Sequence, residues 1–291
     1  MKPESKKFSV SVGQTELTFE TGKLALQAGG AVTVRLGDSI IFAAATMDKN
    51  PREGTDFFPL TVDYEERLYA GGRIPGSFFR REGRPTTDAI LVARLTDRPL
   101  RPLFAEGMRN SVQVIMVSFS SDGENPLDIL AINAASAALM ISDIPWNGPV
   151  AAVRVGMING EFIINPTFQQ LEESDLDLRV AGTRAAISMV ECGANEVPDD
   201  VMVKALDFAH KSMQPIIDVQ MRMQEELGKA KQTVPLFLVE SELVAKVNDR
   251  AAQDITAALD SPHTKAELNN AIDELKDQLV LEFAGEDESL V

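Results

Sequence analysis

Residues 112–140 read VQVIMVSFSSDGENPLDILAINAASAALM, which combines a strand pattern, a turn and a helix pattern. Val112–Phe119 is an apolar run rich in β-branched residues, and such a run predicts a buried strand. Asp122–Asn125 predicts a turn, and Pro126 suits the first position of a helix that we expect to end near Met140. Alanines at positions 131, 134, 135 and 138 give this helix a small face. The stretch therefore predicts a helix that packs closely on a sheet.

Upstream of this stretch, apolar and polar residues alternate in the way that is typical of paired strands. Residues 8–19 and residues 32–47 each hold two such runs around a glycine-containing turn. We therefore expect two β-hairpins there. Residues 57–64 are rich in aromatic and β-branched side chains and predict another strand.

Downstream of it, strands and helices continue. Residues 150–164 predict a hairpin around Asn159-Gly160, and residues 176–191 predict a further strand pair. Residues 198–227 form a long helical pattern, in which Pro215 predicts a kink or a break. An acidic helical pattern over residues 241–283 follows.

One more helix is expected between the early strands and the central stretch. Thr86-Thr87-Asp88 offers N-cap chemistry before residues 89–98, and Pro99 is expected to close that helix. Strands grouped with helices, without strict alternation, predict an α+β fold. We expect residues 1–230 to form a core domain and residues 231–291 to hold a linker and an incomplete all-helical domain.

Composition places the chain among ordinary globular proteins. It has 291 residues, of which 44% are apolar and 25% charged. The single cysteine, Cys192, excludes a disulfide framework and a cysteine-rich zinc site, and we expect it to be a small core residue. No signal peptide and no apolar run long enough for a membrane span is visible, so we expect a cytoplasmic protein without membrane contact.

Charge is distributed unevenly. The formal net charge is −16, which as an average argues against nucleic-acid binding. However, residues 70–110 contain eight arginines, no lysine and four acids, whereas residues 240–291 contain thirteen acids and four bases. An all-arginine segment in an acidic chain predicts a local anion site, because guanidinium groups pair bidentately with phosphate.

The strongest functional candidate is the loop Gly76–Pro85, which reads GSFFRREGRP. Phe78 and Phe79 offer stacking faces for bases, and three arginines beside them offer cations for the backbone of single-stranded RNA. Alternatively, the two phenylalanines pack under the loop while the arginines pair with the acidic body. The residues alone favour neither. The three arginines are Arg80, Arg81 and Arg84.

Two weaker candidates carry charge at close spacing. Arg94, Arg98 and Arg101 could contact phosphate or RNA, or they could form an internal salt network with Asp97. Asp175 and Asp177 flank Leu176, so their side chains share one side of a strand and could share a metal; a solvated strand edge is the favoured alternative. The two histidines lack metal-ligand spacing, and no phosphate-binding loop or dinucleotide motif is present. We therefore expect no metal site in this chain.

Four segments together resemble the N-terminal half of the bacterial polynucleotide phosphorylase family. They are DFFPLTVDY at residues 56–64, AGGRIPGSFFRREGRP at residues 70–85, ARLTDRPLRPLF at residues 93–104 and LDLRVAGT at residues 176–183. The resemblance runs from about residue 8 to at least residue 227. It implies an RNase PH-like core followed by part of the family's all-helical domain.

The resemblance also implies a function. The family degrades single-stranded RNA, including mRNA, from the 3′ end with inorganic phosphate and releases nucleoside diphosphates, helped by a divalent metal, usually Mg²⁺. Two cores per subunit and three subunits close a homotrimeric ring, which can associate with RNA degradosome components. By the family's pattern, Phe78, Phe79, Arg80, Arg81 and Arg84 grip RNA at the channel aperture.

The family's catalytic pattern, which resembles D-H-L-G-D-M-D-F-K in the second core, is incomplete here. Laying Leu176–Arg179 on M-D-F-K puts Leu171 in place of the first acid and Arg179 in place of the lysine, so only Asp175 and Asp177 stay acidic. We therefore expect no catalysis in this half, with Asp175, Asp177 and Arg179 as weak candidates. Mg²⁺ is expected in the second core, which these 291 residues lack.

We expect this portion to serve ring assembly and RNA threading within a phosphorolytic 3′-to-5′ exoribonuclease. Two alternatives stay open at the level of the sequence. One is a non-enzymatic RNA-binding ring subunit, and the other is a free-standing RNase PH-like exonuclease.

Overall fold

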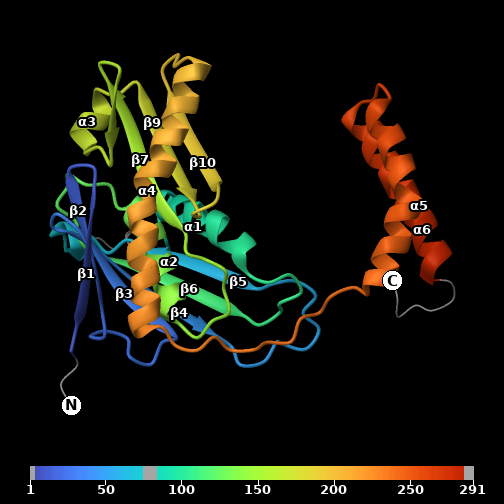
Figure 1. Ribbon diagram of the computed structural model, residues 1–291, viewed down its shortest axis with the longest axis horizontal. Coiled ribbons are helices and arrows are strands. Elements are labelled where there is room, and N and C mark those ends of the chain that lie inside the picture. The colour runs from blue at the N-terminus through green and yellow to red at the C-terminus, as the bar shows by residue number, and fades with distance from the viewer. Residues whose placement is uncertain (1–3, 75–83, 285–291) are drawn as a thin grey trace. The chain divides into compact units, whose positions relative to one another are not determined.

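The computed structural model describes residues 4–74 and 84–284. The chain divides into two compact units, residues 1–236 and residues 237–291, and each is described by itself. The first unit contains two sheets with helices packed on them, which confirms the expected α+β core (Figure 1).

The larger sheet has six strands in the order β1-β2-β3-β4-β6-β5. All neighbouring strands are antiparallel except β5 and β6, which run parallel, and β5 lies at an edge. The expected hairpins are β1–β2 and β3–β4. The strands are β1 (Lys6–Val12), β2 (Thr15–Thr21), β3 (Gly30–Leu36), β4 (Ser39–Met47), β5 (Leu60–Glu65) and β6 (Val112–Ser120).

Helix α2 (Asp128–Ile141) lies on β3 and β4, and every residue from Ile129 to Ile141 is buried. The alanine face allows this close approach, and so does Gly30, where a Cβ would lie 2.1 Å from the Ala138 carbonyl oxygen. Buried polar side chains then join α2 to other elements. The Asn133 amide exchanges two hydrogen bonds of 2.9 Å with the Ala152 backbone. The helix is therefore the centre of the core.

The second sheet has four antiparallel strands in the order β10-β9-β7-β8. Asn159 and Gly160, both with positive φ, form the expected turn between β7 and β8. The long helix α4 packs against β7, β1 and α2 (Figure 1). These elements are β7 (Ala151–Ile158), β8 (Glu161–Ile164), β9 (Leu176–Gly182), β10 (Ile187–Ala194), α4 (Asp199–Leu227) and the short α3 (Phe168–Glu172).

Helix α1 (Thr87–Leu100) packs against the edge strand β5. Its N-cap is Thr86, whose side chain accepts a hydrogen bond from the Ala89 backbone N–H, as the sequence predicts. Two short 3₁₀ turns, η1 (Leu68–Gly71) and η2 (Arg101–Leu103), flank this region.

Two sequence-based expectations are wrong, and they concern Pro99 and Cys192. Pro99 lies inside α1 instead of closing it. Of the two alternatives at Pro215, the break is absent, because α4 runs through this position as one helix, and the kink stays a prediction. Buried neighbours on both sides of Pro215, Met213 and Ile216, hold the helix together where one backbone hydrogen bond is lost. Cys192 is exposed, because it lies on β10, which forms an edge of its sheet.

The segment after α4, residues 229–236, is fastened to the core. The Lys231 ammonium donates hydrogen bonds of 2.9, 3.1 and 2.8 Å to the carbonyl oxygens of Leu139, Met140 and Ser142, at the C-terminal end of α2. Lys229 donates to the Ala28 and Gly29 carbonyls. We call residues 229–236 the strap. It gives partners to helix-end carbonyls that would otherwise lack them.

The second unit contains a pair of packed helices, α5 (Ser241–Asp260) and α6 (Lys265–Ala284). Among its described residues only Ala251 is buried, while Val244, Ile255, Leu259 and Ile272 are exposed. Its assignment to an incomplete all-helical domain stays a prediction. Within the part of the chain that the structure describes, no helix could cross a membrane.

Candidate functional site

An open groove of about 710 Å³ runs between β5 and α1. One wall is formed by residues of β5, and the other by a stripe of α1 that runs from buried Ala89 to exposed Arg94. The volume is in the range of small-molecule and oligomer sites. The lining residues are Leu60–Arg67, Arg84–Thr86, Ala89, Ile90, Ala93, Arg94, Asp97 and Arg101.

Two arginines of this groove are available to a ligand. Arg84 and Arg94 are both exposed. Neither forms an ion pair or a hydrogen bond with any residue in the described ranges 4–74 and 84–284. Unpaired guanidinium groups on a groove wall are suited to phosphate oxygens. With respect to residues 4–74 and 84–284, the groove therefore has two unpaired arginines, Arg84 and Arg94.

Arg101 lines the same groove, but protein groups already accept hydrogen bonds from four of its five N–H donors. It donates to both Asp97 carboxylate oxygens, at 3.0 and 2.7 Å, and to the carbonyl oxygens of Phe58 and Leu60. Its guanidinium also lies 6.0 Å from the Phe58 ring centre. This arrangement ties the end of α1 to the start of β5.

Arg98 does not line the groove. It pairs with Glu191 of β10 at 3.3 Å and thereby connects α1 to the second sheet. The three arginines that the sequence groups together therefore lie in three different surroundings, and only Arg94 is free among the described residues.

The loop that the sequence favours most lies largely outside the described residues. Phe78, Phe79, Arg80 and Arg81 belong to residues 75–83, and of the proposed RNA-contacting set only Arg84 is described. Arg84 directly follows that segment and lines the groove. The role of the loop stays a prediction.

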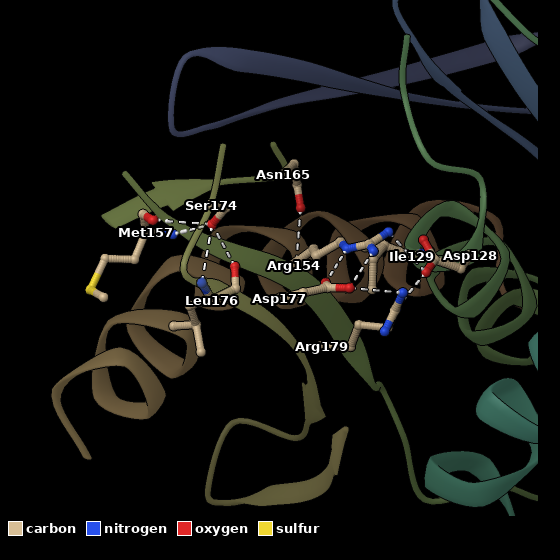
Figure 2. Close-up of polar contacts among 9 residues, drawn as sticks. All are labelled: Asp128, Ile129, Arg154, Met157, Asn165, Ser174, Leu176, Asp177 and Arg179. Atoms are coloured by element: carbon tan, nitrogen blue, oxygen red, sulfur yellow. Dashed lines mark hydrogen bonds and ion pairs between the residues drawn. The ribbon is translucent and has the colours of Figure 1, made fainter. Parts of the chain in front are cut away.

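A partly buried ion-pair cluster around Arg154 occupies the place of the weak catalytic candidates Asp177 and Arg179 (Figure 2). The Arg154 guanidinium donates to both oxygens of Asp177, at 2.6 and 2.7 Å, and to Asp128 at 3.3 Å. Arg179 donates to Asp128 at 2.7 Å and lies 3.3 Å from Asp177. We call these four residues the Arg154 cluster. Its two guanidinium groups balance its two carboxylates.

Two members of the cluster, Asp177 and Arg179, keep their charged forms. Burial raises the pKa of Asp177, but the hydrogen bond and charge of Arg154, together with the charge of Arg179, outweigh it and hold that pKa below its ordinary value. Burial likewise opposes the charge of Arg179, and the neighbouring Asp128 and Asp177 raise its pKa nonetheless. Asp177 is therefore an ionised carboxylate with its oxygens in use, unsuited to proton transfer.

Asp175 is separated from this cluster. It lies just before β9 and is exposed, while its backbone pairs with Met157 and Asn195. In the described ranges, no group of three acidic, histidine or cysteine residues could hold a metal ion. Nearby Tyr64 is buried, and burial together with Glu66 and Asp128 raises its pKa, so its hydroxyl stays protonated at neutral pH.

Sequence reasoning missed two members of the cluster, Asp128 and Arg154. Asp128 looks like an ordinary acid at a helix N-terminus. Arg154, however, interrupts the apolar strand Ala151–Val155, and a charged residue in a buried strand signals a buried partner. That signal is visible in the sequence, although the identity of the partner is not.

Comparison with known families gives two adjacent matches. The model described as "3′ exoribonuclease family, domain 1" matches residues 14–145. The model described as "3′ exoribonuclease family, domain 2" matches residues 148–212. Together they cover strands β2 to β10 and helices α1 to α3 of the first unit, and the first half of α4.

Curated relatives give a similar result. The chain is 50% identical to a polyribonucleotide nucleotidyltransferase of Thermus thermophilus over 96% of its own length and 39% of the relative's. It is 47% identical to one of Bacillus velezensis, over 99% of the chain and 40% of the relative. The chain thus spans about two fifths of the length of the curated relatives it matches.

Solved structures share the fold at low sequence identity. Rice Rrp46 superposes with a TM-score of 0.54 at 14% identity, covering 77% of this chain and 96% of that one. A chain of an Archaeoglobus fulgidus exosome with RNA bound to the active site gives 0.53 at 16% identity, covering 77% and 88%. These similarities concern the fold alone.

Proposed function

Because this chain belongs to the 3′ exoribonuclease family, we propose that it is an RNA-binding, non-catalytic core of a phosphorolytic 3′-to-5′ exoribonuclease. Its substrate class is single-stranded RNA. Its task is to hold and guide the strand, while the attack of inorganic phosphate on the terminal phosphodiester takes place in another core.

The observation that carries this proposal is the groove between β5 and α1. Arg84 and Arg94 line it and have no ionic partner in the described part of the chain. Arg84 follows in sequence the segment that holds Phe78 and Phe79. Arginines and aromatic residues in one stretch of sequence match the two needs of single-stranded RNA, because the phosphates need charge and the bases need stacking faces.

The complete enzyme would need components that this core does not supply. Phosphorolysis releases nucleoside diphosphates, and a divalent cation such as Mg²⁺ would balance charge on the transferring phosphoryl group. The Arg154 cluster does not fit such an ion, because arginines already neutralise Asp128 and Asp177. We therefore place the Mg²⁺ and the chemistry in a second core, and we propose a ring of three subunits.

The test separates binding from chemistry. The purified chain is incubated with oligo(A), inorganic phosphate and Mg²⁺, and ADP release is measured. Fluorescence anisotropy with a labelled oligo(A) measures binding in the same buffer. We expect bound RNA and no ADP. Phosphate-dependent ADP release that Asp177→Asn abolishes would show instead that this core catalyses.

The stacking role is tested with Phe78→Ala/Phe79→Ala. Stacking contributes about 1–3 kcal/mol per base, so we expect roughly 5-fold weaker binding or more, with an unchanged melting temperature. The control is Arg184→Gln, because Arg184 is exposed and pairs with Asp218 away from the groove. Unchanged affinity would remove the stacking role, and a large fall in melting temperature would show that the two rings are buried.

A further inference from the structure

Arg154 is the most buried charged residue of the described chain and lies in a strand that is otherwise apolar. It belongs to β7, and its side chain is 8% exposed. A guanidinium in such a place needs partners for its hydrogen bonds and for its charge. Asp177 on β9 and Asp128 at the start of α2 supply both. The position is therefore specified by an ion pair rather than by apolar packing.

The carboxylate oxygens of the cluster already accept hydrogen bonds, one of them from the Ile129 backbone N–H to Asp128. Arg154 takes both oxygens of Asp177, while one Asp128 oxygen accepts from Arg154 and from Arg179 (Figure 2). The side chains of the two aspartates are 12% and 34% exposed. Both carboxylates pair with the same two guanidinium groups, and carboxylate oxygens are the ligand type that hard divalent cations prefer.

We propose that Arg154 and Arg179 act as built-in counter-ions that keep divalent cations out of the Asp128–Asp177 pair. A cation that entered would have to displace a guanidinium group from at least one carboxylate. The displaced group would stay buried, unpaired and next to a further positive charge, which is a costly arrangement. The same carboxylates would accept a cation once a guanidinium is removed.

The exclusion is not a loss of ligands. Both carboxylates are present, and what prevents coordination is the positive charge of the two guanidinium groups that pair with them. Arg154 and Asp128, which lie outside the LDLR stretch at residues 176–179, therefore help to decide whether this core holds a metal.

The test uses Mn²⁺ as the probe and electron paramagnetic resonance of the free ion as the readout, without RNA and without phosphate. The variants are Arg179→Gln and Arg154→Gln, each also combined with Asp177→Asn. The matched control is Arg184→Gln, which frees a single surface carboxylate, Asp218, from its arginine. Circular dichroism checks that each variant is folded.

We expect the wild-type chain and Arg184→Gln to bind Mn²⁺ equally weakly. Arg179→Gln and Arg154→Gln gain a site at least tenfold tighter, which Asp177→Asn removes. Arg179→Lys keeps a positive charge and gains no site. If Arg154→Gln does not fold, Arg179→Gln carries the test, since Arg179 is the more exposed of the two.

Two results would overturn the proposal. One is Mn²⁺ binding by the wild-type chain that Asp177→Asn abolishes, because the arginines would then fail to exclude the ion. The other is a folded Arg179→Gln variant without any gain. Because the assay contains no RNA, either result leaves the proposal of RNA binding untouched.

Discussion

Arg94 and Arg101 line the same groove, but Arg101 is paired with Asp97, whereas Arg94 has no partner among the described residues. We expect Arg94→Gln to weaken RNA binding and to lower the salt dependence of log Kd by about one phosphate contact, with unfolding free energy changed by less than about 0.5 kcal/mol. Anisotropy titrations at several salt concentrations measure the slope, and urea denaturation measures the stability.

Arg101→Gln should have the opposite pattern, with lower stability and unchanged RNA binding. It removes the bonds to Asp97 and to two backbone carbonyls at the partly exposed end of α1, so we expect a loss of about 1–2 kcal/mol of stability. RNA affinity should stay the same under conditions where the variant is folded. An unchanged stability together with weaker RNA binding would mean that Arg101 breaks its pair with Asp97 and binds an RNA phosphate instead.

Asp122 makes the stability depend on acid pH. Burial raises its pKa, but hydrogen bonds from Asn125, Glu124 and Ser39 outweigh this and lower the pKa from 3.8 to about 2. A carboxyl with a lowered folded pKa stabilises the fold above its unfolded pKa and loses that effect as the pH falls. We expect the loss between about pH 4 and pH 2.

Asp122→Asn checks this assignment. Its melting temperature should be lower than that of the wild-type chain at neutral pH and should fall less between pH 4 and pH 2. Equal slopes for the two proteins would assign the acid dependence to other carboxyls.

At the scale of elements, the strap matters most for α2. Lys231 gives hydrogen bonds to three carbonyl oxygens at the end of a fully buried helix. Burial lowers the pKa of Lys231 to about 8, against the opposing charge of Asp143, so the ammonium form prevails at neutral pH. A methionine at this position would keep the apolar part of the side chain and leave the three carbonyl oxygens without a hydrogen-bond donor.

We therefore expect Lys231→Met to lower the unfolding free energy by about 1–3 kcal/mol. Lys204→Met is the control, because Lys204 is exposed and pairs only with Asp200, one turn away on α4. Thermal denaturation of both variants measures the difference. A loss no larger than that of the control would mean that water replaces the ammonium.

Element boundaries show where sequence patterns suffice. The turn at Asn159-Gly160 and the cap at Thr86 are local chemistry, and both were predictable. The continuity of α4 through Pro215 depends on side chains packed from other elements, and the strap depends on carbonyls about 90 residues away. Long-range partners leave no local pattern, so these features were not predictable.

The same contrast between local chemistry and long-range partners applies to the candidate site. Residue types pointed to arginines at an anion site, but only the fold separates free Arg94 from Arg98, which pairs with Glu191 on another sheet. The order β10-β9-β7-β8 brings Arg154 beside Asp177, 23 residues further along the chain. Strand pairing brings these partners together, and a single sequence does not show which strands pair.

For the whole molecule, charge is the dominant property. Residues 240–291 carry −9 of the total −16, which leaves −7 on residues 1–239. We expect a chain that ends at Leu236 to bind RNA more tightly than the 291-residue chain at low salt, because it lacks most of the repulsion. The difference should vanish near 0.5 M salt, where charges are screened within about 4 Å.

Anisotropy titrations of both chains across salt concentrations measure this effect. A tighter complex with the longer chain at every salt concentration would show that the second unit itself contacts RNA.

Cys192 gives the molecule a ready point of attachment for a reporter group. It is the only thiol, it is exposed, and the register of β10 places it opposite Leu178, one residue from Arg179. A maleimide dye or a nitroxide would therefore enter at one defined position without any engineered cysteine. Burial and the charge of Asp177 raise the pKa of the thiol, so coupling should proceed faster in mildly alkaline buffer than at neutral pH.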